Sequence, residues 1–575
     1  MQAHTKDRMA ISLDEPASGL NRSIEELRGG AQSWSQLTVP ERIGLLEALR
    51  PRIMEHAREW VEAAVAAKGI DPGSPLAGEE WLSGPYGVLY GVNRYIRTLR
   101  SLAKTGRVTL PAGSVRRRGP QLLVRTFPVS AYDKLLFSGI SAEAWLPPDV
   151  REENLVQNMA AYYRAAEHEP RVALVLGAGN IAAIAPLDVL YKLVADGAVC
   201  ILKMNPVNAY LAPVHQKIFA PFIERNYLRI VTGDAATGKY LTDHPGIDEI
   251  HITGSAQTHD AIVYGGLPKD GPKRLDKPIT SELGNVSPTI VLPGKWSRAD
   301  LRFQAENIVT QKMHNGGFNC IAAQVLILPQ DWELADAFVR EIENVIRETP
   351  ARAGYYPGAA QRQATAASES GAREYDEARS GIVPRTLIFA DAQTDHPSFT
   401  NEAFCSVLTV TRLPGDARAF LDNAVAFTND RLYGTLGANI IVNPPTERAL
   451  GDAFEDAVAR LRYGSVSINA WTGVAFLLSE STWGAYPGHT ASDIQSGTGI
   501  VHNTFLFDNA QKTVLRAPFY PFPRSVLNGQ LTLLPRPPWF VTNKQAATIA
   551  QQLLAFEYAP SPLKIPAIFW SALRG

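Results

Sequence analysis

The stretch RVALVLGAGN, Arg171–Asn180, is a short apolar run that ends in two glycines and an asparagine. A helical pattern follows it, and the apolar run AVCILK, Ala198–Lys203, then repeats the arrangement. Two more such runs follow, the last of them EIHI at Glu249–Ile252. Short β-rich runs that alternate with helical segments are typical of a parallel, doubly wound α/β sheet. Because such sheets bind ligands at the carboxyl ends of their strands, we expect a ligand site beside Asn180 and Lys203.

A second series of strand and helix patterns begins after Pro288 and ends with YGSVSIN, Tyr463–Asn469. It predicts a second α/β lobe. After Arg516 the chain is rich in proline and aromatic residues and contains one helical pattern, NKQAATIAQQLLAFE. The apolar residues of this tail are too many to be mostly exposed, which favours either a contact between subunits or the wall of a channel.

The composition of the chain describes a globular protein that acts on small molecules. Its 575 residues are 45% hydrophobic and 20% charged, with a formal net charge of -1 and a pI of about 6.9. These values predict a large core and no basic surface for nucleic acid. The first residues lack the apolar core of a signal peptide, and no apolar run approaches the roughly 20 residues of a membrane span. Three cysteines, odd in number and far apart, predict a reducing cytoplasm without disulfides, and no cysteine or histidine pair has the spacing of zinc ligands.

The loop NGGFNC, Asn315–Cys320, places one cysteine behind two glycines, an aromatic residue and an asparagine. Glycine allows close backbone approach, so the loop could present a thiol together with its own N–H, although a small buried hydrophobe in a turn fits the same residues. A nucleophilic thiol needs an oxyanion-stabilising donor and, to hydrolyse a thioester, a base for water. Glu282, in ITSELGNVSPTIV between the two predicted lobes, is such a base if burial raises its pKa, although an exposed glutamate fits the same pattern.

Two glycines in TGDAATG, Gly233 and Gly238, lie after a predicted strand and before a predicted helix. Glycines permit close backbone approach and a helix N-terminus favours phosphate, so this segment suits a dinucleotide. Its spacing differs from GxGxxG, and a structural turn fits equally well. Lys203, at the end of an apolar strand, could hold a ribose or a phosphate, or could simply be solvated.

The chain resembles the aldehyde dehydrogenase superfamily through motifs that occur in the family's order. They are GAGN followed by Lys203, ITGS at Ile252–Ser255, ELGNVSPTIV from Glu282, NGGFNC ending at Cys320, NEAF at Asn401–Phe404, and YGSVSIN. The similarity covers roughly Ile43 to Arg516. It implies an aldehyde-dehydrogenase-like α/β fold, with a Rossmann-type cofactor lobe and a second α/β catalytic lobe.

The resemblance implies a role for each matched residue. Cys320 would attack the aldehyde to give a thiohemiacetal, and hydride would leave to a nicotinamide. Asn180 and the Cys320 N–H would bind the oxyanion, and Glu282 would activate water to hydrolyse the thioester. The cofactor, NAD or NADP, would lie against Lys203, Gly233, Gly238, Gly254, Ser255, Glu402 and Phe404.

With these roles we expect three regions. Residues 1–285 would form the cofactor-binding lobe, with N-terminal helices and an insertion near residues 119–170. Residues 286–485 would form the catalytic lobe that carries the nucleophilic cysteine. Residues 486–575 would form a return segment and an extended C-terminal tail that serves oligomerisation or covers the substrate entrance. The family precedent predicts a homodimer or homotetramer.

Several positions depart from the family's pattern. Pro206 replaces a glutamate that binds ribose hydroxyls and would repel a 2′-phosphate, so NADP stays possible beside NAD. Asn285 and Cys405 replace two glycines near the cofactor, and the stretch after Trp483 replaces a more regular segment, so the sequence does not name the aldehyde. Medium-to-large apolar or aromatic aldehydes are the class that the aromatic-rich insertions favour.

Two alternatives to aldehyde oxidation with water remain open. One is a CoA-acylating aldehyde dehydrogenase or acyl-CoA reductase, in which the thioester passes to CoA. Such relatives typically lack the general-base glutamate, so Glu282 argues against it. The other is a cofactor-binding scaffold that has the fold and no chemistry, since a fold alone never proves an activity.

Overall fold

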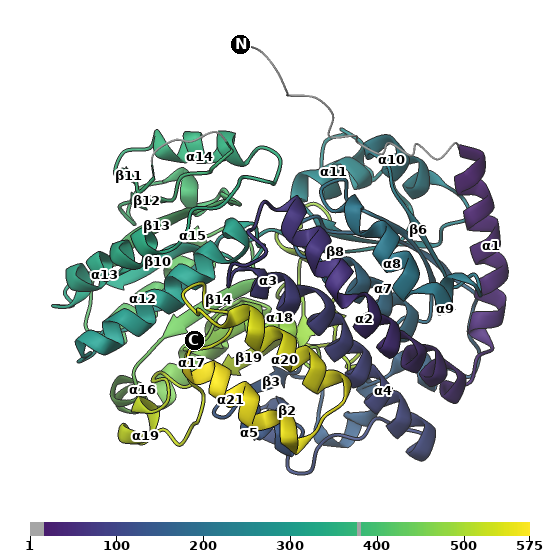
Figure 1. Ribbon diagram of the computed structural model, residues 1–575. Coiled ribbons are helices and arrows are strands. Elements are labelled where there is room, and N and C mark those ends of the chain that lie inside the picture. Colours follow the sequence, from purple (N-terminus) through teal and green to yellow (C-terminus); the bar gives the residue numbers. More distant parts are fainter. Residues whose placement is uncertain (1–16, 377–380) are drawn as a thin grey trace.

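Two β-sheets form the framework of the computed structural model, which describes residues 17–376 and 381–575 (Figure 1). The N-terminal residues that lack a signal-peptide pattern, 1–16, lie outside this range. The smaller sheet has the strand order β17, β8, β7, β4, β5, β6, and its neighbours are parallel except for β8 and β17. Its strands are β4 (Val172–Leu176), β5 (Val199–Lys203), β6 (Leu228–Val231), β7 (Glu249–Gly254), β8 (Ile279–Leu283) and β17 (Gly497–Thr498). The parallel sheet predicted from the alternating pattern is confirmed.

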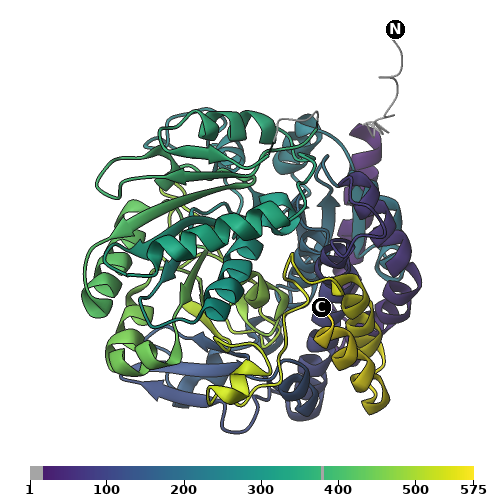
Figure 2. The ribbon, with the colours of Figure 1, turned by 60° about the vertical axis from the view of Figure 1, so that its left-hand side comes forward.

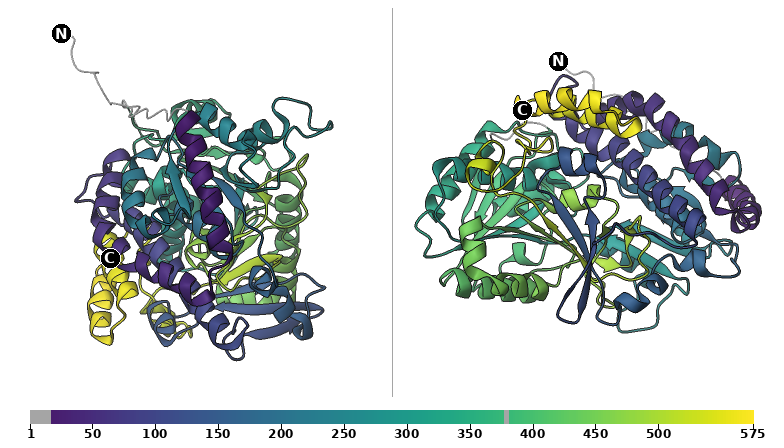
Figure 3. Two further views of the ribbon diagram at one scale, coloured as in Figure 1. Left: turned by 90° about the vertical axis from the view of Figure 1, so that its right-hand side faces the viewer. Right: turned by 90° about the horizontal axis from the view of Figure 1, so that it is seen from below.

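Helices cover the smaller sheet, which explains why its central strand β4 is apolar along its whole length. Every residue of β5 is buried, as expected for a parallel strand that is covered on both faces. α1 (Ala17–Ser35) packs along β4, β5 and β6, and Figure 3 shows it running across this side of the molecule. The other helices of this lobe are α7 (Ile184–Val194), α8 (Ala212–Ile218), α9 (Ala220–Ile223), α10 (Ala235–Asp243) and α11 (Ala256–Tyr264).

The larger sheet has eleven strands in the order β1, β2, β3, β19, β15, β14, β9, β10, β13, β12, β11. The seven strands from β19 to β12 pair in parallel, and antiparallel strands flank them at both edges. The parallel strands are β9 (Ser287–Val291), β10 (Ala323–Pro329), β12 (Thr386–Phe389), β13 (Val407–Leu413), β14 (Gly437–Ile441), β15 (Ser465–Ile468) and β19 (Lys512–Arg516). This sheet is the predicted second α/β lobe.

Alternate residues of β10 face the two helical layers that enclose the larger sheet. Leu326 and Leu328 pack with α12 (Arg298–Met313) and α13 (Ala335–Glu348), whereas Val325 and Ile327 pack with α15 (Ala417–Arg431) and α17 (Asp452–Arg460). A strand places successive side chains on opposite faces, so each layer receives every second residue. α12 runs directly into the loop that carries Cys320.

The region near residues 119–170, assigned above to the cofactor lobe, contributes strands to the larger sheet. β2 (Gln121–Phe127) and β3 (Ser141–Trp145) pair with each other, and β3 pairs antiparallel with β19. β1 (Val115–Arg118) forms the edge. The region thus extends the sheet of the second lobe by three strands.

The C-terminal tail packs against the N-terminal helices of the same chain. α20 (Ala546–Tyr558) lies on α3 (Ala77–Trp81), on the short π-helix η1 (Leu82–Tyr86) and on α2 (Val39–Ala67), and Figures 2 and 3 show the yellow helices of the tail beside the purple N-terminal helices. α21 (Ile565–Leu573) packs beside α20. Trp539, Phe540 and Phe556 are buried by this packing, whereas Trp570 is 65% exposed. Within the described parts of the chain, no helix combines the length and the apolar character that a membrane span requires.

Candidate active site

A cavity of about 750 Å³ opens at the carboxyl ends of β4, β5 and β7, where the parallel sheet was expected to bind a ligand. Nine of the ten residues predicted for the site line it: Asn180, Lys203, Gly238, Gly254, Ser255, Glu282, Cys320, Glu402 and Phe404. Gly233 is not among its described lining residues. Its φ of +141° shapes the turn before α10, where a Cβ would lie 2.7 Å from the Cβ of Thr237.

The wall that the smaller sheet contributes fits a dinucleotide. Lys203, the last residue of β5, is buried at the edge of the cavity, and burial lowers its pKa while the nearby Asp234 carboxylate raises it. Gly238 on α10 leaves open space where another residue would carry a side chain. Gly254 and Ser255 lie at the start of α11, where the Ser255 hydroxyl accepts the Thr258 N–H. Bare backbone beside the N-termini of two helices is the environment that a pyrophosphate requires.

The opposite wall, from the second lobe, presents a carboxyl group with one oxygen that lacks a partner among the described residues. Oε1 of Glu402 is buried and has no hydrogen-bond partner among the described residues, and burial raises the pKa of Glu402 to about 8. Arg362 holds the following segment by donating to the carbonyls of Ala403, at 2.8 Å, and Phe404, at 3.2 Å. An unpaired buried acceptor inside a cavity fits a ligand with a hydroxyl donor, such as a ribose. The residues present therefore fit a nicotinamide dinucleotide.

The loop that carries Cys320 owes its shape to its glycines. Asn315, Gly316 and Gly317 have φ values of 54°, 66° and 82°, a left-handed path that glycine and asparagine tolerate best. A Cβ at Gly317 would lie only 2.5 Å from the carbonyl oxygen of Cys405, so no other residue fits there without a shift of backbone. This path turns the chain at the end of α12 and places the half-buried Cys320 in the cavity.

Glu282 and Cys320 lie in an environment that disfavours charge on both. Burial raises the pKa of Glu282 to about 7, and the negative charge of Asp188 raises it further, while the Cys320 thiol and the Trp483 indole favour the carboxylate. Burial and the neighbouring Glu282 raise the pKa of the Cys320 thiol well above its ordinary value. The thiol is therefore neutral at rest, and the carboxyl beside it changes protonation near neutral pH. A general base works best with such a pKa.

Asn180 lies at the junction of two pockets. It is 6% exposed, and it lines both the large cavity and a second, apolar pocket, as Cys320 does. Its Nδ2 donates one hydrogen bond to the carbonyl of Phe318, at 2.9 Å. A side-chain amide has two N–H donors, so the second one is free for a ligand beside the thiol.

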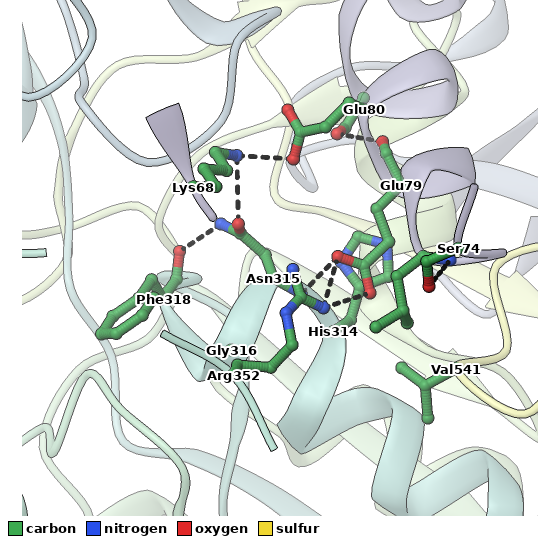
Figure 4. Close-up of polar contacts among 12 residues, drawn as sticks. Lys68, Ser74, Glu79, Glu80, His314, Asn315, Gly316, Phe318, Arg352 and Val541 are labelled. Atoms are coloured by element: carbon green, nitrogen blue, oxygen red, sulfur yellow. Dashed lines mark hydrogen bonds and ion pairs between the residues drawn. The ribbon is translucent and has the colours of Figure 1, made fainter. Parts of the chain in front are cut away.

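A buried polar network behind the loop holds Asn180 and Asn315 in place (Figure 4). Nζ of Lys68 donates to Oε1 of Glu80 at 2.7 Å, to the carbonyl of Asn180 at 3.0 Å and to Oδ1 of Asn315 at 3.0 Å. Nδ2 of Asn315 in turn donates to the carbonyls of Asn180 and Phe318, each at 3.1 Å. The ammonium group of Lys68 thus links the segment that carries Asn180 to the loop that carries Cys320.

A second ion pair completes this network. Arg352 donates to both carboxylate oxygens of Glu79, at 3.1 and 3.0 Å, and the backbone N–H of Asn315 donates to Oε2 of the same carboxylate, at 3.1 Å. Although burial alone would raise the pKa of Glu79, Arg352 and the other partners hold it below its ordinary value. Two carboxylates and two cations are therefore buried together and neutralise each other.

Replacement of Lys68 by methionine is expected to destabilise the protein strongly. The variant leaves Glu80 as a buried carboxylate without its cation, and breaking a buried pair in this way costs about 3–5 kcal/mol. The measurement is the free energy of unfolding by denaturant titration. Lys217→Met is the matched control, because Lys217 forms an ion pair with Glu59 at the surface, and exposed pairs contribute at most about 1 kcal/mol. Equal losses in the two variants would contradict the role given to the buried pair.

The sequence interpretation did not identify this supporting network. The adjacent carboxylates Glu79 and Glu80, flanked by Leu76, Ala77 and Leu82, were its one visible signal, because two acids amid apolar residues require buried partners. Lys68 and Arg352 gave no local signal, since each lies far along the chain from the loop it supports. Among the described residues, no cluster of side chains is suited to hold a metal ion.

Comparisons with known proteins agree with this geometry. A family model described as the aldehyde dehydrogenase family matches residues 171–479, more than half of the chain. The chain is 31% identical over 185 residues to N-succinylglutamate 5-semialdehyde dehydrogenase of Sphingopyxis alaskensis, a match that covers 32% of this chain and 36% of that protein. Across the first three curated relatives that it matches, the chain spans 36% to 62% of their length.

Solved structures share the fold at low sequence identity. An NAD-dependent aldehyde dehydrogenase from Sinorhizobium meliloti superposes with a TM-score of 0.59 at 17% identity, over 88% of each chain. An NADP-dependent glyceraldehyde-3-phosphate dehydrogenase from Bacillus halodurans superposes with a TM-score of 0.58 at 18% identity, over 87% of this chain and 91% of that one. These likenesses establish the two-lobed fold.

Proposed function

Because the chain belongs to the aldehyde dehydrogenase family, we propose that it oxidises an aldehyde to a carboxylic acid, with NAD or NADP as the hydride acceptor. One observation carries the proposal: a single cavity brings a thiol, a carboxyl group with a pKa of about 7 and a free amide N–H together at the end of a dinucleotide-sized groove. These are the nucleophile, base and oxyanion donor of acyl chemistry on a cysteine.

In the first half of the reaction, Cys320 adds to the aldehyde carbonyl. Glu282 lies beside the thiol and can accept its proton, which compensates for the raised pKa of the cysteine. The second N–H of Asn180 and the backbone N–H of Cys320 stabilise the oxygen of the thiohemiacetal. A bound nicotinamide would supply the hydride acceptor, and loss of hydride from the thiohemiacetal would leave a thioester on Cys320.

In the second half, Glu282 acts as the base for hydrolysis. After Glu282 has released the thiol proton to solvent, its carboxylate removes a proton from a water molecule that attacks the thioester carbonyl. The bond from carbon to sulfur then breaks, the carboxylic acid leaves, and the Cys320 sulfur takes up the proton that Glu282 holds. This step favours water over CoA as the acceptor, because a buried carboxylate beside the thioester is a base that transfer to a thiol does not require. CoA-acylating chemistry is thus the second candidate.

The proposal is tested by following reduced nicotinamide with each cofactor and a panel of aldehydes, with analysis of the products by mass spectrometry. We expect a free carboxylic acid as product, in equal amount to the reduced cofactor and with or without CoA. An acyl-CoA as the product would overturn the hydrolytic step. Binding of a cofactor without turnover of any aldehyde would indicate a scaffold without chemistry.

Replacement of Asn180 by alanine is expected to lower kcat by about 10²–10³-fold, the loss that follows removal of one oxyanion donor. KM for the aldehyde should change much less, because the charge on oxygen develops only after binding. Steady-state kinetics measures both. Asn208→Ala is the matched control: Asn208 is a buried amide that donates to Ala178 of the same loop at 2.8 Å and is not among the described lining residues of the cavity. An equal loss of kcat in the control would indicate that Asn180 only shapes the loop.

A further inference from the structure

A second pocket meets the reaction centre on the side away from the dinucleotide groove. Cys320 and Asn180 lie at its inner end. Its walls are apolar and aromatic: Ile181, Ile184, Trp471, Phe476, Leu477 and Trp539. These residues come from three separate parts of the chain, the loop and helix after β4, the segment after β15, and the tail. An aldehyde whose carbonyl carbon lies against the thiol would place its acyl chain here.

The pocket offers no charged partner to a substrate, and its free polar atoms are few: beside the amide of Asn180, Nδ1 of His314 has no hydrogen-bond partner among the described residues. None of the lining residues in the described parts of the chain is an acid, a lysine or an arginine. Ser83 donates its hydroxyl to the carbonyl of Glu79 at 2.5 Å, and Asn319 donates its amide to the carbonyl of His314 at 2.9 Å. Burial lowers the pKa of His314, so that imidazole is neutral. A carboxylate or ammonium group on the substrate would be desolvated here without compensation.

Trp539 forms part of the pocket wall, and its position is fixed by contacts with α12, the helix that leads to Cys320. Two residues further on, the N–H of Val541 donates to Oγ1 of Thr310 on α12, at 3.1 Å. Arg536 forms an ion pair with Glu306 on the same helix, at 3.0 Å. Trp539 itself is 8% exposed. The tail is thus attached to α12 on both sides of this indole, which makes the wall a rigid part of the site.

The free volume of the pocket is small. It measures about 50 Å³, and one water-sized group needs about 10–15 Å³ on this measure, so there is room for about four such groups. A short unbranched acyl chain fills that space. A longer chain meets the indole of Trp539.

We propose that this pocket binds the acyl chain of short, uncharged aliphatic aldehydes, and that Trp539 of the tail sets the limit on chain length. The proposal rests on the proposed function, because it places the aldehyde carbonyl at Cys320. It replaces the medium-to-large apolar or aromatic aldehydes favoured by the sequence with short apolar ones, because the pocket has little free volume, and it gives the tail a role in substrate choice.

The first test compares kcat/KM along a series from propanal to decanal, together with succinic semialdehyde as a charged aldehyde close in length to butanal. For the wild type we expect the highest value at a chain of about four to six carbons, and at least a 100-fold lower value for succinic semialdehyde than for butanal. In Trp539→Ala the ratio of kcat/KM for decanal over butanal should rise at least tenfold, and in Trp539→Phe it should rise less. Trp570→Ala, a change of an exposed tail tryptophan, should leave the ratio unchanged. An unchanged ratio in Trp539→Ala, or a wild type that prefers the semialdehyde acid, would overturn the proposal.

A second test does not depend on turnover, so it separates this proposal from the proposed function. Alkyl methanethiosulfonates of increasing length attach their alkylthio group to a thiol, and Cys200 and Cys405 are buried, so mass spectrometry reports on Cys320. With cofactor bound, the rate should fall at least tenfold between propyl and octyl reagents in the wild type and much less in Trp539→Ala. The charged 2-sulfonatoethyl reagent should react at least tenfold more slowly than the propyl one. If no aldehyde is oxidised but the labelling rates differ as expected, the pocket is as proposed and the proposed oxidation of aldehydes is wrong. Equal rates with all reagents would overturn the pocket even in an active enzyme.

Discussion

Cys320→Ala is expected to abolish turnover, with a loss of kcat of at least about four orders of magnitude. Without the thiol there is no thiohemiacetal, and a hydrated aldehyde in this cavity has no covalent attachment from which hydride could leave. Cofactor binding should persist, because Lys203, Ser255 and Glu402 are untouched. The measurement is reduced nicotinamide at steady state and in a single turnover, beside a titration of cofactor binding.

The control for this variant is Cys200→Ala. Cys200 lies in β5, fully buried and outside the described lining of both pockets, so its replacement removes a thiol of the same chain without touching the site. It should retain full activity. Comparable turnover in Cys320→Ala and Cys200→Ala would remove the thioester from the mechanism, and with it the proposed function.

Glu282→Gln is expected to separate the two halves of the reaction. Hydride transfer should still give one equivalent of reduced nicotinamide per site, because Cys320 and Asn180 remain, although more slowly than in the wild type, because the thiol loses the carboxylate that accepts its proton. The steady state should then fall by about 10²–10⁴-fold, the range of a general base, because water is no longer activated. Rapid mixing would show a burst followed by a slow phase, and mass spectrometry of the intact chain should show the acyl group on the enzyme. Restoration of fast turnover by CoA, with acyl-CoA as product, would instead favour the CoA-acylating alternative.

The pH dependence of the wild type follows from the same carboxyl group. Burial raises the pKa of Glu282 to about 7, and the base acts only when deprotonated. The hydrolytic rate should therefore rise about tenfold per pH unit below 7 and level off above it, and this rise should disappear in Glu282→Gln. Glu402→Gln is the comparison, since its carboxyl group is also buried in the cavity and also has a raised pKa. Glu402→Gln should bind the cofactor more weakly, and its hydrolytic rate should still rise with pH, because Glu282 is unchanged. If the rise of the rate with pH disappeared in Glu402→Gln and persisted in Glu282→Gln, Glu402 would be the base and the role given to Glu282 would be wrong.

The framework of the first lobe could be predicted because its signal is local. β4 and β5 are short, mainly apolar runs covered on both faces, so each can be recognised as a buried strand from five consecutive residues. The nucleophile loop was visible for a similar reason, since Gly317 lies where a Cβ would meet the backbone of Cys405. Patterns of this kind lie within a few consecutive residues, so they can be recognised before the distant residues that they contact are known.

The parts that could not be predicted depend on pairings between distant residues. Lys68 lies at the end of α2, and nothing near it in the sequence indicates that it bonds to Asn315. In the sequence Trp539 is only an apolar residue of the tail, and the fold alone shows that it lines the same pocket as Cys320. The region near 119–170 contains clear strand patterns, but their position in the larger sheet depends on pairing with β19, whose register no local pattern specifies.

The attachment of the tail to α12 also has a consequence for how the enzyme is made. Cys320 and Asn180 are translated long before Trp539, and chains fold progressively as they leave the ribosome. On a nascent chain the thiol therefore emerges without the indole that later closes its pocket, accessible to electrophiles of any size. If Trp539 sets the limit on chain length as proposed, selectivity is acquired only when the tail docks, and a chain that stops before residue 539 carries the thiol without its size filter.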